Sequence, residues 1–463
     1  MKNKFKTVLF VAILVTVLTF ACLDSMPTSV PTNATQVSQP PTQQAPLKEE
    51  GKLEITSTSS YVDSYNDYNV VGEIVNNTNE AIENITLSLS VTDETGTSLL
   101  KDENDSPVDR LDIQPYIGVL DPGTSAPFSY YLSAEEVQPA KFEVAIKSYD
   151  PSSAAKRTEF DIQNVQTTYR DNGDVILTGE VVNLSSEQMD VETLAGALFD
   201  SAGKVLAANS TLTYSRYLYP AGDPSGRDRG PFIVTLFGPI KNVSRWKVYV
   251  RSVENTTTPS VDVDVQLTGS YVDPSGTYHL LGQVTNNGSS QILPSVIGGL
   301  YNSDKIVLDA ASSSIPLYLN AGESAPFDLN TFQVINSLPA DQTSSAKEIV
   351  EPDLYWTFSS DYDVMSLEVK DVQITQDGSD WTISGTVVNT SDKNLGSISA
   401  VIQFLDGDQK IMATNSTSIY PPDGSDTIEP GASSDFSIPI YAPEEWDLSS
   451  QKYQMILQGV VSQ

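Results

Sequence analysis

The segment Val175-Ile-Leu-Thr-Gly-Glu-Val-Val-Asn183 decides the fold of this chain, because three other segments repeat its pattern. These are residues 68–76, 278–286 and 381–389, and all four share a central glycine, at positions 72, 179, 282 and 385. Alternate residues are apolar, and many are β-branched or aromatic, which predicts a strand with one buried face. The glycine stands on the apolar face, so we expect another group to approach it closely. The chain is therefore a tandem repeat of β-structure.

Two further anchors recur behind each glycine. Asp93, Asp200, Asn302 and Asp406 each follow an apolar run, and Asp200-Ser-Ala-Gly203 before Lys204-Val-Leu206 predicts a hairpin turn into another strand. A glycine then precedes a phenylalanine by five residues in three repeats, as Gly123 to Phe128, Gly322 to Phe327 and Gly431 to Phe436. The second repeat departs from this spacing, with Gly230-Pro-Phe232 after a longer loop.

These anchors resemble the FxLYD family of envelope-associated immunoglobulin-like domains, which joins a G-x-V-x-N strand to a later F-x-L-Y-D strand and turn. Leu198-Phe199-Asp200 and Leu300-Tyr301-Asn302 match best. The leading Phe of the family is replaced by Leu89, Gly196, Gly298 and Ile402, and repeat 1 fits least well. The resemblance covers most of residues 52–463. It implies a β-sandwich and brings no catalytic residues.

We predict an all-β chain of four tandem immunoglobulin-like antiparallel β-sandwich domains. A signal or lipoprotein-like segment (1–22) and a disordered tether rich in Pro, Thr, Ser and Gln (23–51) precede four repeats (52–150, 158–253, 261–362 and 365–463). A unit of about 100 residues buries enough surface to fold alone. The short links predict units that keep separate interiors.

The first residues predict export. Lys2, Lys4 and Lys6 precede an apolar run that ends at Cys22, the single cysteine of the chain. Leu18-Thr-Phe-Ala-Cys22 resembles a lipoprotein signal, although Leu18 lies one position early and Phe20 is bulky. We therefore expect lipidation at Cys22 and a location on the outer face of the cytoplasmic membrane or on the cell surface. Cleavage after Ala21 and an uncleaved anchor are the alternatives.

The net charge limits which partners the chain can bind, and its Asn-x-Ser/Thr triplets are candidate glycosylation sites. The net charge of −34 repels phosphate backbones and excludes nucleic acid as a partner. Asn-x-Ser/Thr triplets are possible glycosylation sites in an exported archaeal protein and mean little in most bacteria. The candidates are Asn209, Asn415, Asn84 and Asn242, and further triplets begin at Asn33, Asn76, Asn104, Asn183, Asn255, Asn287 and Asn389.

Residues that could carry chemistry are few. A triad, a zinc site or a histidine base needs partners that the only histidine, His279, lacks in the sequence, so we expect it exposed on a strand. Calcium could bind Asp102-Glu-Asn-Asp105 with Asp109, or Asp262 with Asp264, but neither set has the spacing of a known loop and solvated acids are favoured. A tyrosine and arginine cluster could stack on sugars, although strand-edge tyrosines are favoured: Tyr214, Tyr217, Tyr219, Arg216, Arg227 and Arg229.

We therefore predict a non-enzymatic binding or spacer protein without cofactor, held at the membrane by its N-terminus. Its partner is an unidentified protein or glycan, and the roles of adhesin and passive spacer stay open. The alternative is an accessory domain protein or a carboxylate-dependent hydrolase acting on envelope glycans.

Overall fold

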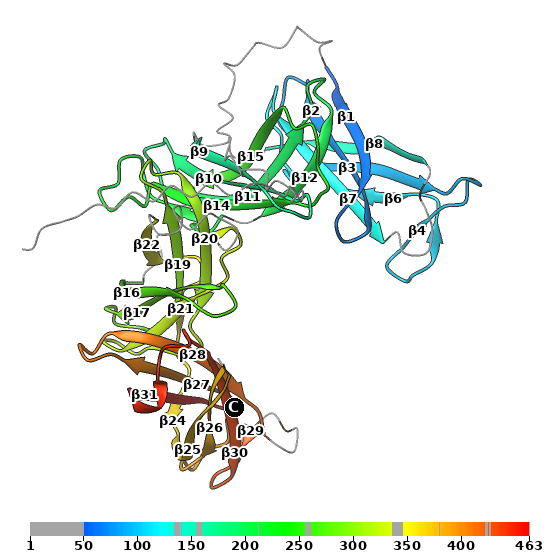
Figure 1. Ribbon diagram of the computed structural model, residues 1–463. Helices are drawn as coiled ribbons and strands as arrows, with labels where there is room; N and C mark the ends of the chain where they lie inside the picture. Colours follow the sequence, from blue (N-terminus) through cyan, green and yellow to red (C-terminus); the bar gives the residue numbers. More distant parts are fainter. Residues whose placement is uncertain are drawn as a thin grey trace, which may run out of the picture. The chain divides into compact units, whose positions relative to one another are not determined.

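Antiparallel β-sheets build the computed structural model of the chain (Figure 1). The structure describes residues 51–133, 139, 141–153, 160–211, 213–254, 261–335, 346–378, 380–421, 425 and 427–462. These ranges contain no α-helix, and a 3₁₀ turn, η2, spans Leu448–Ser450. All described residues belong to one compact unit of the chain. The prediction of an all-β chain is confirmed, whereas Cys22 and the predicted tether up to residue 50 lie outside the described residues.

Repeat 1 forms two three-stranded sheets and a small hairpin. One sheet has the order β1-β2-β7, the other β6-β3-β8, and β4 pairs with β5. The strands are β1 (Leu53–Val62), β2 (Asp67–Asn76), β3 (Ile82–Thr92), β4 (Leu100–Lys101), β5 (Pro107–Val108), β6 (Leu111–Ile113), β7 (Ser125–Ser133) and β8 (Lys141–Pro151).

Repeat 2 keeps this plan. The sheet β14-β10-β9 contains β10, the strand formed by the repeated segment 175–183. The second sheet, β12-β11-β13, is extended by β15, which also pairs with β11. The strands are β9 (Phe160–Tyr169), β10 (Val175–Asn183), β11 (Met189–Phe199), β12 (Val205–Thr211), β13 (Tyr217–Leu218), β14 (Arg229–Leu236) and β15 (Arg245–Glu254).

Repeats 3 and 4 repeat the arrangement. Repeat 3 has sheets β16-β17-β21, β20-β19-β22 and β18-β23, and repeat 4 has β25-β26-β30 and β24-β31-β27-β28 with β29 on β27. Their strands are β16 (Val263–Val272), β17 (Tyr278–Asn286), β18 (Gln291–Leu293), β19 (Ser295–Tyr301), β20 (Val307–Ser314), β21 (Ser324–Leu329), β22 (Lys347–Pro352), β23 (Phe358–Ser360), β24 (Val364–Ser366), β25 (Glu368–Asp377), β26 (Asp380–Val388), β27 (Leu395–Leu405), β28 (Ile411–Ile419), β29 (Thr427–Ile428), β30 (Ser433–Tyr441) and β31 (Lys452–Val461).

The four key strands are β2, β10, β17 and β26, and each key glycine pairs in register with the phenylalanine of the third anchor. The pairs are Gly72 with Phe128, Gly179 with Phe232, Gly282 with Phe327, and Gly385 with Phe436. A Cβ on Gly179 would lie 2.7 Å from Cζ of Phe232, so only glycine leaves room for the ring. The predicted close approach at the glycine is confirmed.

A buried asparagine ends three of the key strands and directly follows the fourth, β26, and it closes the turn that follows. In repeat 2 the Asn183 amide donates to the carbonyls of Glu187 (2.7 Å) and Tyr219 (2.8 Å), while its oxygen accepts from the Ser185 amide (2.8 Å). Asn76, Asn286 and Asn389 make the same three kinds of bond. The side chain thus replaces backbone partners that a turn leaves unpaired.

The second anchor is the hairpin turn that the sequence predicts. The Asp200 carboxylate accepts from the backbone amides of Ala202 (2.8 Å) and Lys204 (2.9 Å), and β12 begins at the next residue. Asp93, Asn302 and Asp406 make the equivalent bonds. In each repeat this turn leads out of β3, β11, β19 or β27.

Each repeat has an apolar interior, and two of these interiors continue across a junction, since the cluster of repeat 3 includes Val401 of repeat 4. The cluster of repeat 1 includes Ala195, Ala197 and Phe199 of repeat 2. Smaller apolar clusters join Ile176 to Ala310 and Leu281 to Ile411. The interior of repeat 1 is therefore not closed off from repeat 2, contrary to the expectation drawn from short links.

Candidate functional site

The three junctions between successive repeats share one hydrogen bond. In each case a hydroxyl donates from the sheet that contains the key strand of one repeat. The acceptor is a backbone carbonyl of the next repeat, on the first residue of the strand that follows the hairpin turn. Thr178 donates to the Val307 carbonyl at 2.6 Å within a buried contact, and Thr268 donates to the Ile411 carbonyl at 3.5 Å. Ser59 donates to the Val205 carbonyl in the same way. The three acceptors each lie five residues after the anchor Asp or Asn, so one surface is reused at every junction.

The burial of each key strand depends on whether another repeat packs against its outer face. Strands β2, β10 and β17 are buried on both faces over most of their length, whereas β26 alternates between buried and half-exposed residues. One face lies in the repeat's own interior and the other meets the next repeat. On β26 the outward positions are Thr382, Ser384 and Thr386, which are polar and tolerate water.

A charged network reinforces the first junction. Glu73 on β2 is buried, and one of its oxygens accepts from Lys247 Nζ at 2.9 Å, from the Tyr249 hydroxyl at 2.8 Å and from the Ser125 hydroxyl at 2.8 Å. Lys247 Nζ also donates to Ser125, and it lies 4.5 Å from the centroid of the Tyr249 ring. A buried carboxylate is stable in this position because its charge is paired and its lone pairs are occupied.

The pKa values record this pairing. Burial by itself raises the pKa of Glu73, but the Lys247 charge and the three donors outweigh it and hold the pKa below its usual value. Burial, followed by the charge of Glu73, raises the pKa of Tyr249 far above its usual value, so this hydroxyl stays protonated and donates. The network can bind and orient groups, and its carboxylate stays ionised.

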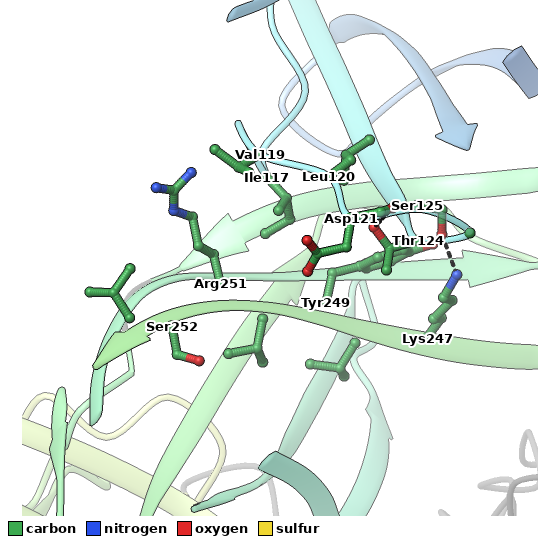
Figure 2. Close-up of a pocket in the computed structure, with 14 residues that line it drawn as sticks. Ile117, Val119, Leu120, Asp121, Thr124, Ser125, Lys247, Tyr249, Arg251 and Ser252 are labelled. Atoms are coloured by element: carbon green, nitrogen blue, oxygen red, sulfur yellow. Dashed lines mark hydrogen bonds between the residues drawn. The ribbon is translucent and has the colours of Figure 1, made fainter. Parts of the chain in front are cut away.

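Figure 2 shows the pocket beside this network, with a volume of about 260 Å³. The outward residues of β15, Lys247, Tyr249 and Arg251, form one wall, because alternate residues of a strand share a face. The loop before β7 and the first residue of β7 form the other wall, with Asp121 beside Thr124 and Ser125. Arg251 is paired with Glu192, so both cations of the pocket are neutralised within the protein.

The predicted tyrosine and arginine cluster lies at the second junction. Arg216 pairs with Asp190, with its second contact at 3.1 Å, and its guanidinium lies 3.9 Å from the centroid of the Tyr355 ring of repeat 3. Ser215 donates to Glu351, and Arg229 lies 3.7 Å from Glu180. The sequence pointed to this cluster but not to its partners, because Tyr355 and Glu351 are more than 100 residues away along the chain.

The expectation of an exposed histidine is wrong. His279 is 2% exposed at the third junction, because its side of β17 faces repeat 4. Its Nδ1 lies 2.7 Å from Asp328 and its Nε2 lies 3.5 Å from Asp273. The Tyr271 ring stacks on the imidazole with centroids 4.5 Å apart, and its hydroxyl donates to the Tyr441 carbonyl of repeat 4 at 2.6 Å.

Two carboxylates therefore flank the only imidazole of the chain. Burial alone would lower the pKa of His279, but the bonds and charges of Asp328 and Asp273 outweigh it, so the pKa is raised above its ordinary value. Burial raises the pKa of Asp328. A cavity of about 510 Å³ opens beside this group and is also lined by Asn330, Asp380 and Tyr441. The sequence did carry one signal for this burial: the key strands of the first three repeats also have apolar residues on the face that alternation assigns to solvent, such as Leu281 beside His279 on β17.

The calcium candidates show no cation site within the described ranges, where no group of three or more His, Cys, Asp or Glu side chains is placed to hold a metal. Asp102 instead accepts from the amides of Asn104 (2.9 Å) and Ser106 (3.0 Å), as the anchor aspartates do. Asp264 accepts from Gln266 at 2.7 Å, on a strand face. Local turn and strand contacts therefore account for these acids.

The glycosylation candidates differ in their surroundings. Asn242 and Asn84 are both exposed, and Asn84 donates to Asp150 at 3.2 Å. Asn209 and Asn415 are half-buried on β12 and β28, and their amides donate to the carbonyls of Thr235 and Pro439, each at 2.8 Å. Cys22, Asn33 and Asn255 lie outside the described residues. Among the described residues, no helix is long and apolar enough to span a bilayer.

Comparison with known proteins gives only a weak likeness. No family profile and no curated protein matches the chain. It is similar to the native conformation of Escherichia coli alpha-2-macroglobulin at 11% identity and a TM-score of 0.12, over 87% of this chain and 28% of that one. For the same protein activated by porcine elastase, the values are 9%, 0.13, 89% and 44%. The chain thus spans less than half of either structure.

Proposed function

We propose that this chain is a non-enzymatic spacer of the cell envelope, built from four immunoglobulin-like domains whose junctions hold successive domains in a fixed orientation. A hydroxyl-to-carbonyl bond at all three junctions carries the proposal, because its acceptor is always the first residue of the strand after the hairpin turn. A chain whose domains act independently has no need to repeat one contact at every link. A spacer does, because its reach depends on the sum of its junctions.

The domain assignment is supported by the sheets. Each repeat places a three-stranded sheet that carries the key glycine against a second antiparallel sheet, with the apolar side chains of both between them. Two antiparallel sheets enclosing an apolar interior are the defining feature of immunoglobulin-like sandwiches. The G-x-V-x-N part of the FxLYD resemblance lies on the key strand, and its F-x-L-Y-D part lies where the next long strand enters the hairpin turn.

The location is proposed from the sequence. The basic start, the apolar run and Cys22 support export and lipid anchoring, and the polar segment 23–51 supports a tether between the anchor and the first domain. Intact mass spectrometry of the membrane-associated chain tests the anchor. A diacylglycerol mass at Cys22, lost in Cys22→Ser, is expected; an unmodified, freely secreted chain would remove this part.

Spin-label distances test the spacer role. In the full chain with Cys22→Ser, one label on an exposed residue of repeat 2 and another on repeat 3 should give a narrow distance distribution, as narrow as two labels within repeat 2. Thr178→Val, which removes the buried donor to Val307, should broaden the distribution across the junction only. Broad distributions across all three junctions in the unmodified sequence would sink the proposal.

A further inference from the structure

Four aromatic side chains form a continuous row where repeat 2 meets repeat 3. Tyr217 lies 5.4 Å from Tyr355, Tyr355 lies 5.0 Å from Trp356, and Trp356 lies 6.0 Å from Phe358, all measured between ring centroids. Successive rings are tilted by 74°, 89° and 83°, the edge-to-face geometry that aromatic pairs prefer. We call these residues the aromatic row.

The far end of the row is open to solvent. Trp356 is 46% exposed and Phe358 is 49% exposed. The other three tryptophans, Trp246, Trp381 and Trp446, are buried or half-buried. Leaving two large rings half in water gives up burial worth about 1.5–3 kcal/mol for each fully buried side chain, so the fold itself gains nothing from this placement.

The loop that carries the row is fixed in place. Asp353 is buried and accepts from the backbone amides of Tyr355 (3.1 Å) and Trp356 (3.2 Å), and its own amide donates to the Ser295 carbonyl at 2.9 Å. The buried Thr357 hydroxyl accepts from the Ser295 amide at 3.0 Å. Hydrogen bonds therefore hold the residues on either side of Trp356 against β19. Because the loop is already fixed, a ligand that binds the exposed rings does not have to pay the entropy cost of ordering it.

Hydrogen-bonding groups border the row. The Arg216 guanidinium covers the Tyr355 ring and is paired with Asp190, and both side chains stay partly exposed. Open aromatic faces beside a charged donor and acceptor suit a ligand with apolar C–H faces and hydroxyl edges. The net charge of −34 disfavours an anionic ligand.

We infer that the aromatic row is a binding site for a neutral carbohydrate chain. Sugar rings would pack their C–H faces on Trp356 and Phe358, and their hydroxyls would bond to Arg216 and Asp190. The site goes beyond the spacer role, because it gives the spacer a surface that holds a glycan. Its failure would leave the junctions unaffected.

Fluorine NMR of the full chain labelled with 5-fluorotryptophan tests the site, because the chain has four tryptophans and Trp356→Phe identifies one resonance. The probes are cellohexaose, maltohexaose and chitohexaose, with hexagalacturonate as the charged counterpart. At least one neutral hexamer should shift the Trp356 resonance and leave the other three in place. Because these variants lack the reporter, isothermal titration calorimetry measures their affinity: Trp356→Ala should weaken that binding at least about tenfold, the loss expected for a central aromatic anchor, while Trp356→Tyr should retain most of it.

Tyr131→Ala is the matched control, because Tyr131 is also exposed but lies on β7 of repeat 1. It should leave binding unchanged. Three outcomes would overturn the inference: no neutral hexamer shifts the Trp356 resonance, binding survives Trp356→Ala, or hexagalacturonate binds as tightly as the neutral probes. Photo-crosslinking from position 358 in intact cells that captures only polypeptide would also overturn it, in favour of a protein partner.

Discussion

Gly282 and Phe327 face each other across β17 and β21, and a Cβ added to Gly282 would lie 2.5 Å from Cε1 of the Phe327 ring. The carbonyl of Gln266 closes the space from the other side. The glycine therefore has a steric role: it leaves the space on the strand that the phenylalanine ring occupies. The same pair recurs in all four repeats.

Gly282→Ala should destabilise repeat 3 by about 3 kcal/mol, the upper end for overpacking, because neither a phenyl ring nor backbone can move aside cheaply. Hydrogen exchange of the β17 and β21 amides measures this locally, without assuming that the whole chain unfolds in one step. Gly269→Ala in the same repeat is the control, since a Cβ there meets nothing within 4 Å. Equal exchange rates in the two variants would contradict the steric role.

The stability of the third junction should depend on the proton of His279. The folded pKa is raised above the ordinary 6.5, so the contribution of the imidazolium is complete below about pH 6.5 and is lost as pH rises through the folded pKa. Because the sequence has one histidine, its imidazole NMR signals report this titration directly. An apparent pKa at or below 6.5 would contradict the geometry.

Asp328→Asn should lower that pKa by removing the carboxylate nearest Nδ1, and should reduce the pH dependence of exchange at the junction. Asp262→Asn is the matched control, because Asp262 is exposed on the same repeat. It should leave the titration of His279 unchanged.

The first junction should loosen when Glu73 loses its charge. Glu73→Gln keeps the shape of the side chain but leaves Lys247 without its anion, at a cost of about 2 kcal/mol for hydrogen bonds to a charged group. Because the folded pKa of Glu73 is lowered, the wild-type contribution is present above the ordinary value of 4.5 and is lost as pH falls through the folded value.

Spin-label distances between repeats 1 and 2 measure this effect, with Glu94→Gln as the control on an exposed carboxylate of repeat 1. Broadening should occur in Glu73→Gln at neutral pH and in the wild type only at acid pH. An unchanged distribution in Glu73→Gln would show that the apolar contacts hold the junction without the network.

Asn389→Asp should destabilise repeat 4 by about 3 kcal/mol. The substitution keeps the acceptor oxygen but removes the amide that donates to the carbonyls of Lys393 (2.7 Å) and Ile428 (2.8 Å), leaving buried acceptors opposite a carboxylate. Urea unfolding followed by Trp381, which is buried on β26, reports this repeat. Asn394→Asp, at an exposed position, should be close to neutral.

Burial of the asparagine side chain also separates the Asn-x-Ser/Thr triplets that can carry a glycan in the folded chain from those that cannot. In a host that glycosylates asparagine, peptides with Asn242 should carry glycan mass after purification of the folded chain, whereas peptides with Asn183 should not. The Asn183 amide is fully buried and holds two carbonyls, so no amide hydrogen is free for transfer. Mass spectrometry of the digested chain checks both sites, and full occupancy of Asn183 would mean modification before folding.

Much of the fold could be predicted from the sequence because its determinants are local or strictly periodic. Alternation along residues 175–183 indicates the strand, Asp200 indicates its hairpin turn, and the glycine indicates a close neighbour. The site could not be predicted in this way. Tyr214, Tyr217 and their arginines were visible as a cluster, but Tyr355 and Glu351, which complete it, stand on the next repeat.

The sequence by itself determined four β-repeats, their key strands, the asparagine and aspartate turns, and the acidic surface. Only the tertiary structure decided which outward faces meet the next repeat, and hence that His279 is buried between two carboxylates, that Glu73 holds Lys247, and that Trp356 stays in water. The physical reason is the range of the interactions. Strand periodicity and turns act between neighbours along the chain, whereas desolvation and charge pairing at a junction depend on groups that only folding brings together.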